Sequence, residues 1–342
     1  MDVAQARLRA QRLSSARLKA AADVVRWFGA VQAQDYSGAK WALGQRMRTA
    51  NDSSVEAAFA AGEILRTHLM RPTWHFVARE DIRWMLDLTA PRVRAASGSA
   101  YRQLELDDRV LRRATDVLIR ALDPGRPLTR IALREALARS GINTDGQRFA
   151  YMLIHAELEA AICSGPRVGK QFTYALVDQR AAGARRLERD EALATLAQRY
   201  FTSHGPARVR DFTWWSGLTV ADAQAAVAMV RPRLVQESLD GAAYWFAASA
   251  PRASDTPARA FLLPAYDEYL VAYRDRGASL DPAVVVDGRV VGRWRRTLAA
   301  RSNLVTLKFF APLAPRQEHA AREAAHRYAE FTGVPVVVTC ER

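Results

Sequence analysis

The stretch DDRVLRRATDVLIRAL, residues 107–122, sets the pattern that decides the fold. Its apolar residues recur at intervals of three and four, the spacing of one face of an α-helix. The sequence PGRP at 124–127 ends this helix, and Thr129 is placed to begin a second helix over 130–139. A turn at 141–146 then leads to a third helix, predicted over 147–162.

A β-hairpin is predicted directly after these three helices. The sequence CSGPRVGK, residues 163–170, is typical of a hairpin tip, and the second strand is predicted over 172–177. Three helices followed by a hairpin is the order of elements in a winged helix-turn-helix. The segment 104–182 is therefore predicted to be one such unit.

The same order recurs in segment 183–250 and, more loosely, in segment 1–103. The later repeat has helices predicted over 187–200, 208–216 and 219–229 and a hairpin over 234–246 with its turn at Asp240-Gly241. The first hundred residues have helices predicted over 18–31 and 54–61 and paired strands over 64–69 and 73–77. The repetition predicts three winged-helix units in tandem.

The last segment, 251–342, changes in character and is predicted to be a β-rich domain. Its predicted elements are a hairpin over 284–291 with Asp287-Gly288 at the turn, strands over 303–310 and 334–339, and a helix over 318–331. The expected fold class is therefore α+β, with three tandem winged helix-turn-helix units and a C-terminal β-rich domain.

The charge of the chain points to a polyanionic partner. Its 342 residues include 50 Lys and Arg against 36 Asp and Glu, a net charge of +14, and only four of the cations are lysines. A GC-rich genome favours arginine, but codon bias does not explain an unbalanced charge. Guanidinium groups suit phosphate contacts, so nucleic acid is the expected partner.

Several other classes of protein are disfavoured by the sequence. It has no apolar run of the roughly 20 residues that a membrane span needs, and the charged start of the chain is unlike a signal peptide. Two cysteines without a CxxC motif predict a reduced, cytoplasmic setting. The six histidines are scattered without a zinc-site spacing, so neither a metal nor a cofactor is expected.

The segment FGAVQAQDY, residues 28–36, carries the chemistry that the rest of the chain lacks. It contains Gln32 and Gln34 separated by one residue, followed by Asp35. From the residues alone, a glutamine pair of this kind caps a helix or faces solvent. A resemblance to a known family implies a different role for this pair.

Five segments together resemble the bacterial winged-helix DNA glycosylases of the AlkZ type. They are FGAVQAQDY (28–36), RPTWHFV (71–77), FTWWSGL (212–218), LPAYDEY (263–269) and GRVVGRW (288–294). The resemblance implies three tandem winged helices with a C-terminal β-domain, no cofactor, and hydrolysis of bulky N7-alkylguanines and interstrand crosslinks. It also implies that Gln32 and Gln34 are catalytic, because a Gln-x-Gln motif is catalytic in that family. The sister branch, which resembles YcaQ, has Gln-x-Asp, so Gln34 places this chain with the AlkZ-like branch.

Amides are chemically adequate for this reaction. N7-alkylation makes guanine a cationic leaving group that needs no general acid, and a carbonyl dipole can orient water and stabilise the positive charge that develops on the sugar. In a regular helix, residues i and i+2 diverge by about 200°. We therefore expect the preceding helix to end at or before Gln32, so that both amides can share a face.

Further residues are candidates with open alternatives. Asp35 can assist the cationic sugar, serve at a helix end or form a salt bridge. His75, next to Trp74, can assist or simply pack in a strand. Arg71, beside a turn, is predicted to contact phosphate. The strand residues Arg293, Trp294, Arg295 and Arg296 either contact DNA or form a solvated edge strand. Tyr266, Asp267 and Glu268 match the family without an evident role.

The expected function is a monofunctional DNA glycosylase that acts on double-stranded DNA containing alkylated guanine, as a monomer, in repair or in self-resistance to a toxin. The alternative is a non-enzymatic winged-helix DNA-binding protein, such as a transcription regulator, or a relative that retains only lesion binding. A regulator usually dimerises to read two half-sites, and the sequence shows no long heptad seam.

Overall fold

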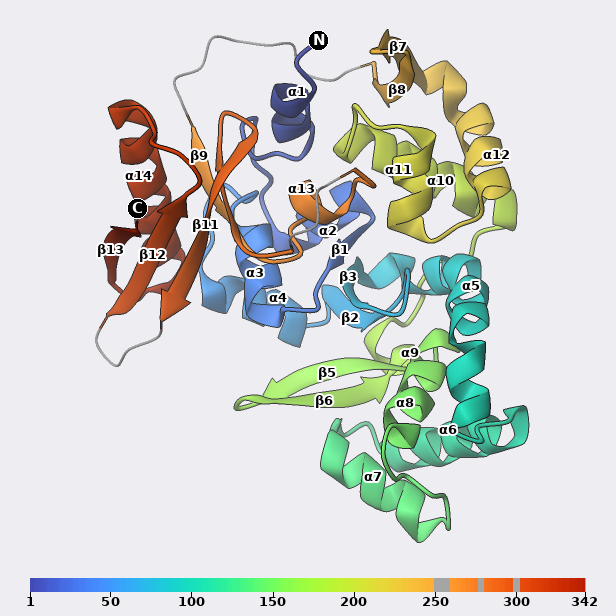
Figure 1. Cartoon of the computed structure of the whole chain (residues 1–342). Helices are drawn as coiled ribbons and strands as arrows, with labels where there is room; N and C mark the ends of the chain where they lie inside the picture. The colour runs from blue at the N-terminus through green and yellow to red at the C-terminus, as the bar shows by residue number, and fades with distance from the viewer. Residues whose placement is uncertain (249–258, 276–279, 298–301, 342) are drawn as a thin grey trace. The chain divides into compact units, whose positions relative to one another are not determined.

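The computed structural model describes residues 1–248, 259–275, 280–297 and 302–341 (Figure 1). The chain forms two compact units. One contains residues 57–193 and 216–219, and the other contains residues 1–56, 194–215 and 220–342. The four segments predicted from sequence follow the order of elements along the chain, whereas these units group residues by contact, so the four-segment division stays a prediction.

The unit of residues 57–193 is built of helices and two antiparallel hairpins. Its elements are β2 (Ile64–His68), β3 (Trp74–Ala78), the 3-10 helix Arg79–Asp81, α5 (Ile82–Gln103), α6 (Asp108–Leu122), β4 (Leu128–Thr129), α7 (Arg130–Arg139), α8 (Arg148–Leu158), β5 (Ile162–Val168), β6 (Gln171–Leu176) and α9 (Val177–Arg180). Strands β4, β6 and β5 form one antiparallel sheet in that order.

The helices of this unit follow their predicted spacing closely. Asp107 caps α6 by accepting from the backbone of Val110, and Thr129 caps α7, which spans the predicted residues. The apolar faces of α6, α7 and α8 meet in one core, in which Leu118, Leu133 and Met152 are fully buried.

Two predicted boundaries in this unit are wrong. The third helix, predicted to reach 162, ends at Leu158, because Ala160 takes a positive φ of 53° and turns the chain. The apolar run then continues as strand β5, in which Ile162 pairs with Leu176. Cys163 therefore lies in a strand rather than at the hairpin tip.

The second unit contains the other helices and the largest sheet. Its elements are α1 (Val3–Ala10), α2 (Ala21–Phe28), β1 (Ala30–Gln32), α3 (Tyr36–Gly44), most of α4 (Asp52–Ala60), α10 (Arg189–Ser203), α11 (Val209–Ser216), α12 (Val220–Val230), the 3-10 helix Arg231–Arg233, β7 (Leu234–Leu239), β8 (Ala242–Ala247), β9 (Ala260–Leu263), α13 (Glu268–Val271), β10 (Ala283–Val286), β11 (Arg289–Thr297), β12 (Asn303–Phe309), α14 (Pro315–Thr332) and β13 (Val336–Glu341).

Both predicted Asp-Gly hairpins are confirmed. Asp240-Gly241 joins β7 to β8, and Asp287-Gly288 joins β10 to β11; all four turn residues have positive φ. The expected mixture of α and β structure is thus observed, with antiparallel hairpins between groups of helices.

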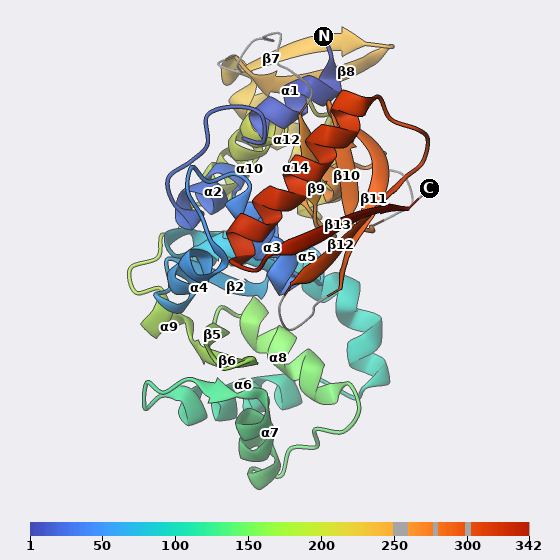
Figure 2. The ribbon, with the colours of Figure 1, turned by 90° about the vertical axis from the view of Figure 1, so that its left-hand side faces the viewer.

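The C-terminal sheet has the strand order β13-β12-β11-β10-β9, and α14 lies along one face of it (Figure 2). The predicted apolar stripe of α14 is buried, including Ala321 and Tyr328. Strand β11 pairs with β12 as far as Thr297 but with β10 only as far as Arg293, so the edge-strand interpretation is wrong at Arg293, whereas residues 294–296 pair with β12 alone. Among the described residues, no helix has both the length and the apolar character that a membrane span requires.

Candidate active site

Gln32 lies in an extended segment that follows directly on a helix. Helix α2 ends at Phe28, and Gly29 takes a φ of 88°, a conformation that favours glycine. The three residues of β1 follow and end at Gln32. The prediction that the helix ends before Gln32 is confirmed, and the helix is shorter than the predicted 18–31 because the chain turns at Gly29.

The two glutamines differ in exposure. Gln32 is 6% exposed, whereas Gln34 lies in a bend beyond the strand and is exposed. The side-chain oxygen Oε1 of Gln32 is buried, and no described residue donates a hydrogen bond to it. A buried acceptor without a protein donor can accept a hydrogen bond from a bound substrate or from water.

The buried carboxylate of Glu268, at the start of α13, holds the backbone of Gln32. Oε1 of Glu268 accepts a hydrogen bond from the backbone N–H of Gln32 at 2.8 Å. Oε2 accepts from the indole Nε1–H of Trp215 at 2.8 Å and lies 3.2 Å from Nε2 of His204. Glu268 is only 1% exposed. Both of its oxygens are therefore used to fix the end of β1 against α11 and the end of α10.

His204 forms the far side of this network and is fully buried. Its ring stacks on Tyr200 with centroids 4.6 Å apart, and Nδ1 lies 2.8 Å from Oγ of Ser203. Burial lowers the pKa of His204, and the neighbouring Glu268 offsets part of that decrease. Desolvation thus favours the neutral imidazole beside the carboxylate.

Asp267, the residue before Glu268, anchors the other side of the same turn. Its two carboxylate oxygens accept from Nη1 and Nη2 of Arg46 at 2.9 and 2.8 Å. Arg46 also donates from Nε to the backbone oxygen of Gln11 at 3.0 Å and from Nη1 to that of Ala42 at 2.8 Å. This bidentate pair is buried, and it ties the turn before α13 to α1 and α3.

Asp35 stands at the start of α3. It occupies the cap position without a side-chain capping bond, and its backbone oxygen accepts from the N–H of Ala39 at 2.8 Å. A Cβ added to Gly38 would lie 2.5 Å from Oδ2 of Asp35, so the carboxylate packs directly on that glycine. This geometry agrees with the helix-end alternative for Asp35.

His75 and Arg71 belong to the unit of residues 57–193. His75 is buried in β3 opposite Thr67, with Nδ1 2.9 Å from the backbone oxygen of Thr73. The neighbouring Trp74 packs against His68, with ring centroids 4.0 Å apart. Arg71 has a φ of 55° in the turn between β2 and β3. These surroundings agree with strand packing for His75, and its auxiliary role and the phosphate contact of Arg71 stay predictions.

The predicted DNA-binding residues of β11 alternate between two environments. Trp294 is 6% exposed; its Nε1–H donates to the backbone oxygen of Leu263 at 2.8 Å and its ring packs against Tyr328. The indole of Trp294 is thus used in the core, and the proposal below does not include a DNA contact by this residue. The arginines point elsewhere: Arg293 pairs with Asp281, Arg295 with Glu341, and Arg296 donates to the hydroxyl of Tyr328. Their DNA contacts stay predictions.

The described side chains include no group of three or more His, Cys, Asp or Glu that could hold a metal ion. Around Gln32 the structure places a neutral amide and the buried, hydrogen-bonded carboxylate of Glu268.

Comparisons with known proteins place the chain in a family. Residues 25–331 match the family described as DNA glycosylase AlkZ-like. The chain belongs to the AlkZ-like DNA glycosylase family. Over 341 residues it is 27% identical to a protein of Streptomyces sahachiroi named interstrand DNA cross-link repair glycosylase, covering 84% of this chain and 85% of that protein. The solved structure of the Streptomyces sahachiroi DNA glycosylase AlkZ has a similar fold, with a TM-score of 0.81, 23% identity and 98% of each chain covered.

Sequence analysis of this AlkZ-like chain missed the residues that hold Gln32 in place. The segment LPAYDEY drew attention to Asp267 and Glu268, but gave no indication of their partners Arg46, Trp215 and His204. One signal was present in the sequence: two consecutive acids directly after an apolar strand and a proline-containing turn are poorly explained as solvent-facing residues.

Proposed function

We propose that this chain is a monofunctional DNA glycosylase that hydrolyses the N-glycosidic bond of bulky or cationic N7-alkylated purines in double-stranded DNA, including the unhooking of interstrand crosslinks. The observation that carries the proposal is the buried, unpaired Oε1 of Gln32 on a backbone fixed by Glu268. Membership of the AlkZ-like family and the name of the Streptomyces relative support it.

The reaction follows from the electrostatics of the site. The alkylated base is already cationic, so it leaves as a neutral purine. The charge that the enzyme must stabilise is therefore the positive one that develops on the sugar. No described residue donates to the amide oxygen of Gln32, which can therefore stabilise that charge or hold the attacking water. Gln34, being exposed, is placed to meet DNA that approaches from solvent.

The surroundings of Lys40 support the monofunctional assignment. A bifunctional glycosylase uses an amine nucleophile, which must be unprotonated and free to attack the sugar. Lys40, the lysine nearest to Gln34 along the chain, has its Nζ 2.8 Å from carboxylate oxygens of both Asp52 and Glu56. Lys40 is thus held in ion pairs by two carboxylates rather than free to attack a sugar, so water is the proposed nucleophile.

The proposal includes a fold interpretation. Segments 1–103, 104–182 and 183–250 would act as three winged-helix units, and segment 251–342 as the β-rich domain. In segment 104–182 the order of three helices and a hairpin, with the short strand β4 joining β6, supports this interpretation. In segment 183–250 the order α10, α11, α12 and the β7–β8 hairpin supports it as well.

The proposal also includes a monomer acting on DNA in the cytoplasm. The net charge of +14 supports a polyanionic partner. Both cysteines are free thiols, and burial raises the pKa of Cys163 to about 12. Such an inert, buried thiol is compatible with a reducing compartment.

The decisive experiment measures free base released from a duplex that contains N7-methylguanine, and from a crosslinked duplex, by wild type and by Gln32→Ala. Gln198→Ala is the matched control, because the Oε1 of Gln198 is also buried and unpaired but lies on α10. We expect release by wild type and by the control, and slow release by Gln32→Ala. If wild type binds both duplexes tightly and releases no base from either, the chain is a DNA-binding protein rather than a glycosylase.

A further inference from the structure

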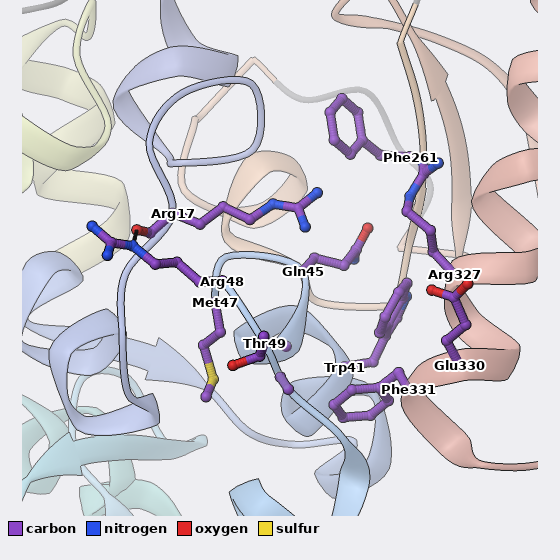
Figure 3. Close-up of a pocket in the computed structure, with 12 residues that line it drawn as sticks. Arg17, Trp41, Gln45, Met47, Arg48, Thr49, Phe261, Arg327, Glu330 and Phe331 are labelled. Carbon is purple, nitrogen blue, oxygen red and sulfur yellow. Dashed lines mark hydrogen bonds between the residues drawn. The ribbon is translucent and has the colours of Figure 1, made fainter.

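Two adjoining pockets lie beside α14, and the C-terminal part of α3 lines the smaller one. Their volumes are about 300 and about 560 Å³, and Arg17, Phe261 and Arg327 line both of them. Figure 3 shows Arg17 and Arg327 entering the first pocket from opposite sides, with the amide of Gln45 between them. We call the combined space that these shared residues line the arginine pocket.

The cations of the arginine pocket repel one another. Burial is the main cause that lowers the pKa of Arg17, and the charge of Arg259, which lines the larger pocket, lowers it further. Burial likewise lowers the pKa of Arg327, followed by the charge of Arg17. Within the described residues, no carboxylate lies within ion-pair distance of these three guanidinium groups. Positive charge is therefore concentrated here without a neutralising ion pair.

The acids at the rim do not cancel this charge. Glu323 and Glu330 line the pockets from α14, are exposed, and act on Arg327 without forming an ion pair with it. Counting Arg48 at the edge of the smaller pocket, four arginines face two glutamates, which leaves an excess of two positive charges. A half-buried excess of this kind is compensated most directly by an anion.

Two polar side chains in the wall of the smaller pocket already make hydrogen bonds. The indole N–H of Trp41 donates to the backbone oxygen of Leu262 at 2.7 Å, and the amide of Gln45 donates to the same oxygen at 3.3 Å. Phe331 and Phe261 supply apolar surface. Arg327 donates from Nη2 to the backbone oxygen of Ala260 at 2.6 Å, so the donors that remain are its other N–H groups and the guanidinium group of Arg17, whose planar forks match the oxygens of a phosphate group in geometry and charge.

We propose that the arginine pocket is a second binding site of this chain, specific for a phosphate group and separate from Gln32. The Gln-x-Gln segment precedes the first residue of α3, and Trp41 is the first residue of α3 that lines the pocket, so five helical residues separate the two sites, a length of about 8 Å. The source of the phosphate is the backbone of duplex DNA outside the lesion. The binding of phosphate itself does not depend on the glycosylase proposal.

The test uses the full chain and the double variant Arg17→Gln/Arg327→Gln. The matched control is Arg316→Gln/Arg322→Gln. It also removes two positive charges, both from α14, at positions that do not line either pocket. Two quantities are measured: the thermal midpoint in inorganic phosphate against chloride of equal ionic strength, and the affinity for undamaged duplex DNA over a range of salt concentrations.

We expect phosphate to raise the thermal midpoint of wild type and control but not of the double variant, because a ligand that binds the folded state stabilises it. We also expect the slope of log affinity against log salt to fall by about 0.9 in the double variant, the value for one lost phosphate contact. If phosphate protects but the slope is unchanged, the phosphate site stands and its ligand is free phosphate or a mononucleotide. If phosphate protects the double variant as well as wild type, or protects none of the three proteins, the proposal is wrong.

Discussion

The carboxylate of Glu268 accepts a hydrogen bond from the backbone N–H of Gln32, 236 residues earlier in the chain, at a distance of 2.8 Å. The same carboxylate accepts from Trp215 at 2.8 Å. The charge of Glu268 is therefore turned away from solvent. Its carboxylate joins the segment of Gln32 to that of Trp215 through hydrogen bonds. Because the backbone of Gln32 is held in this way, Glu268 also determines the position of its side chain.

Glu268→Gln should slow excision by up to about 100-fold, because small displacements of a catalytic group have effects of that size. The amide keeps the shape of the side chain, but one of its two ends is now a donor facing the N–H of Gln32 or of Trp215. Single-turnover excision and DNA affinity are measured separately. We expect the rate constant to fall while the dissociation constant for DNA stays within about twofold.

A matched control for this variant is Glu237→Gln, the same substitution at an exposed position of β7. It should leave both the rate and the affinity unchanged. If Glu268→Gln instead weakens excision and DNA binding in equal proportion, or excises as fast as the control, then Glu268 does not position Gln32.

Asp267→Asn should destabilise the protein by about 3–5 kcal/mol, the typical cost of leaving one partner of a buried ion pair unpaired. Arg46 is the partner, and it is nearly inaccessible to water. Urea unfolding of wild type and variant measures the difference in free energy of unfolding. A loss below about 1 kcal/mol would show that water or a rearranged acceptor replaces the carboxylate.

The parts of the fold that sequence could predict are those with local causes. Helix α7 was predicted at both ends because Thr129 caps it and a turn follows it. Helix α8 was predicted too long because periodicity continues through residue 162, while the turn that ends the helix is made by Ala160, a residue with no turn preference. For the site, the Gln-x-Gln segment was found, but the support of Gln32 by Glu268 depends on a contact across the whole chain.

The free energy of unfolding should fall as pH falls from about 6.5 to about 4, owing to His155. Burial is the main cause that lowers its pKa to about 4, with a smaller decrease from Arg94 and an opposing increase from Asp108. The unfolded chain therefore binds a proton on His155 in this range while the folded chain does not, so acid favours unfolding. Because His155 is partly exposed, solvent screening reduces the expected loss to about 1–2 kcal/mol.

The measurement is the difference between wild type and His155→Asn in urea unfolding at pH 7 and at pH 4, since other groups titrate equally in both proteins. The variant should lose less stability than wild type on acidification. Parallel pH profiles would show that His155 remains protonated to the same extent in the folded and unfolded states.

The last prediction concerns the glutamine pair. Gln32→Ala should slow excision by about 10²–10³, the usual effect of removing one preorganised polar group, with a value near the lower limit because the cationic base already leaves readily. The change in free energy of unfolding should stay within about 1 kcal/mol, because the lost oxygen made no hydrogen bond with any described residue. Excision at single turnover and urea unfolding test the two halves of this expectation.

The exposure of Gln34 makes a sharper comparison possible. Gln34→Ala should have a smaller effect than Gln32→Ala, because an exposed amide is solvated before DNA arrives whereas the buried one is fixed in place. Gln34→Asp should retain at least part of the activity, because a carboxylate also stabilises a cationic sugar. If both alanine variants excise at the wild-type rate while remaining folded, the pair is structural, and the unpaired oxygen of Gln32 needs another explanation.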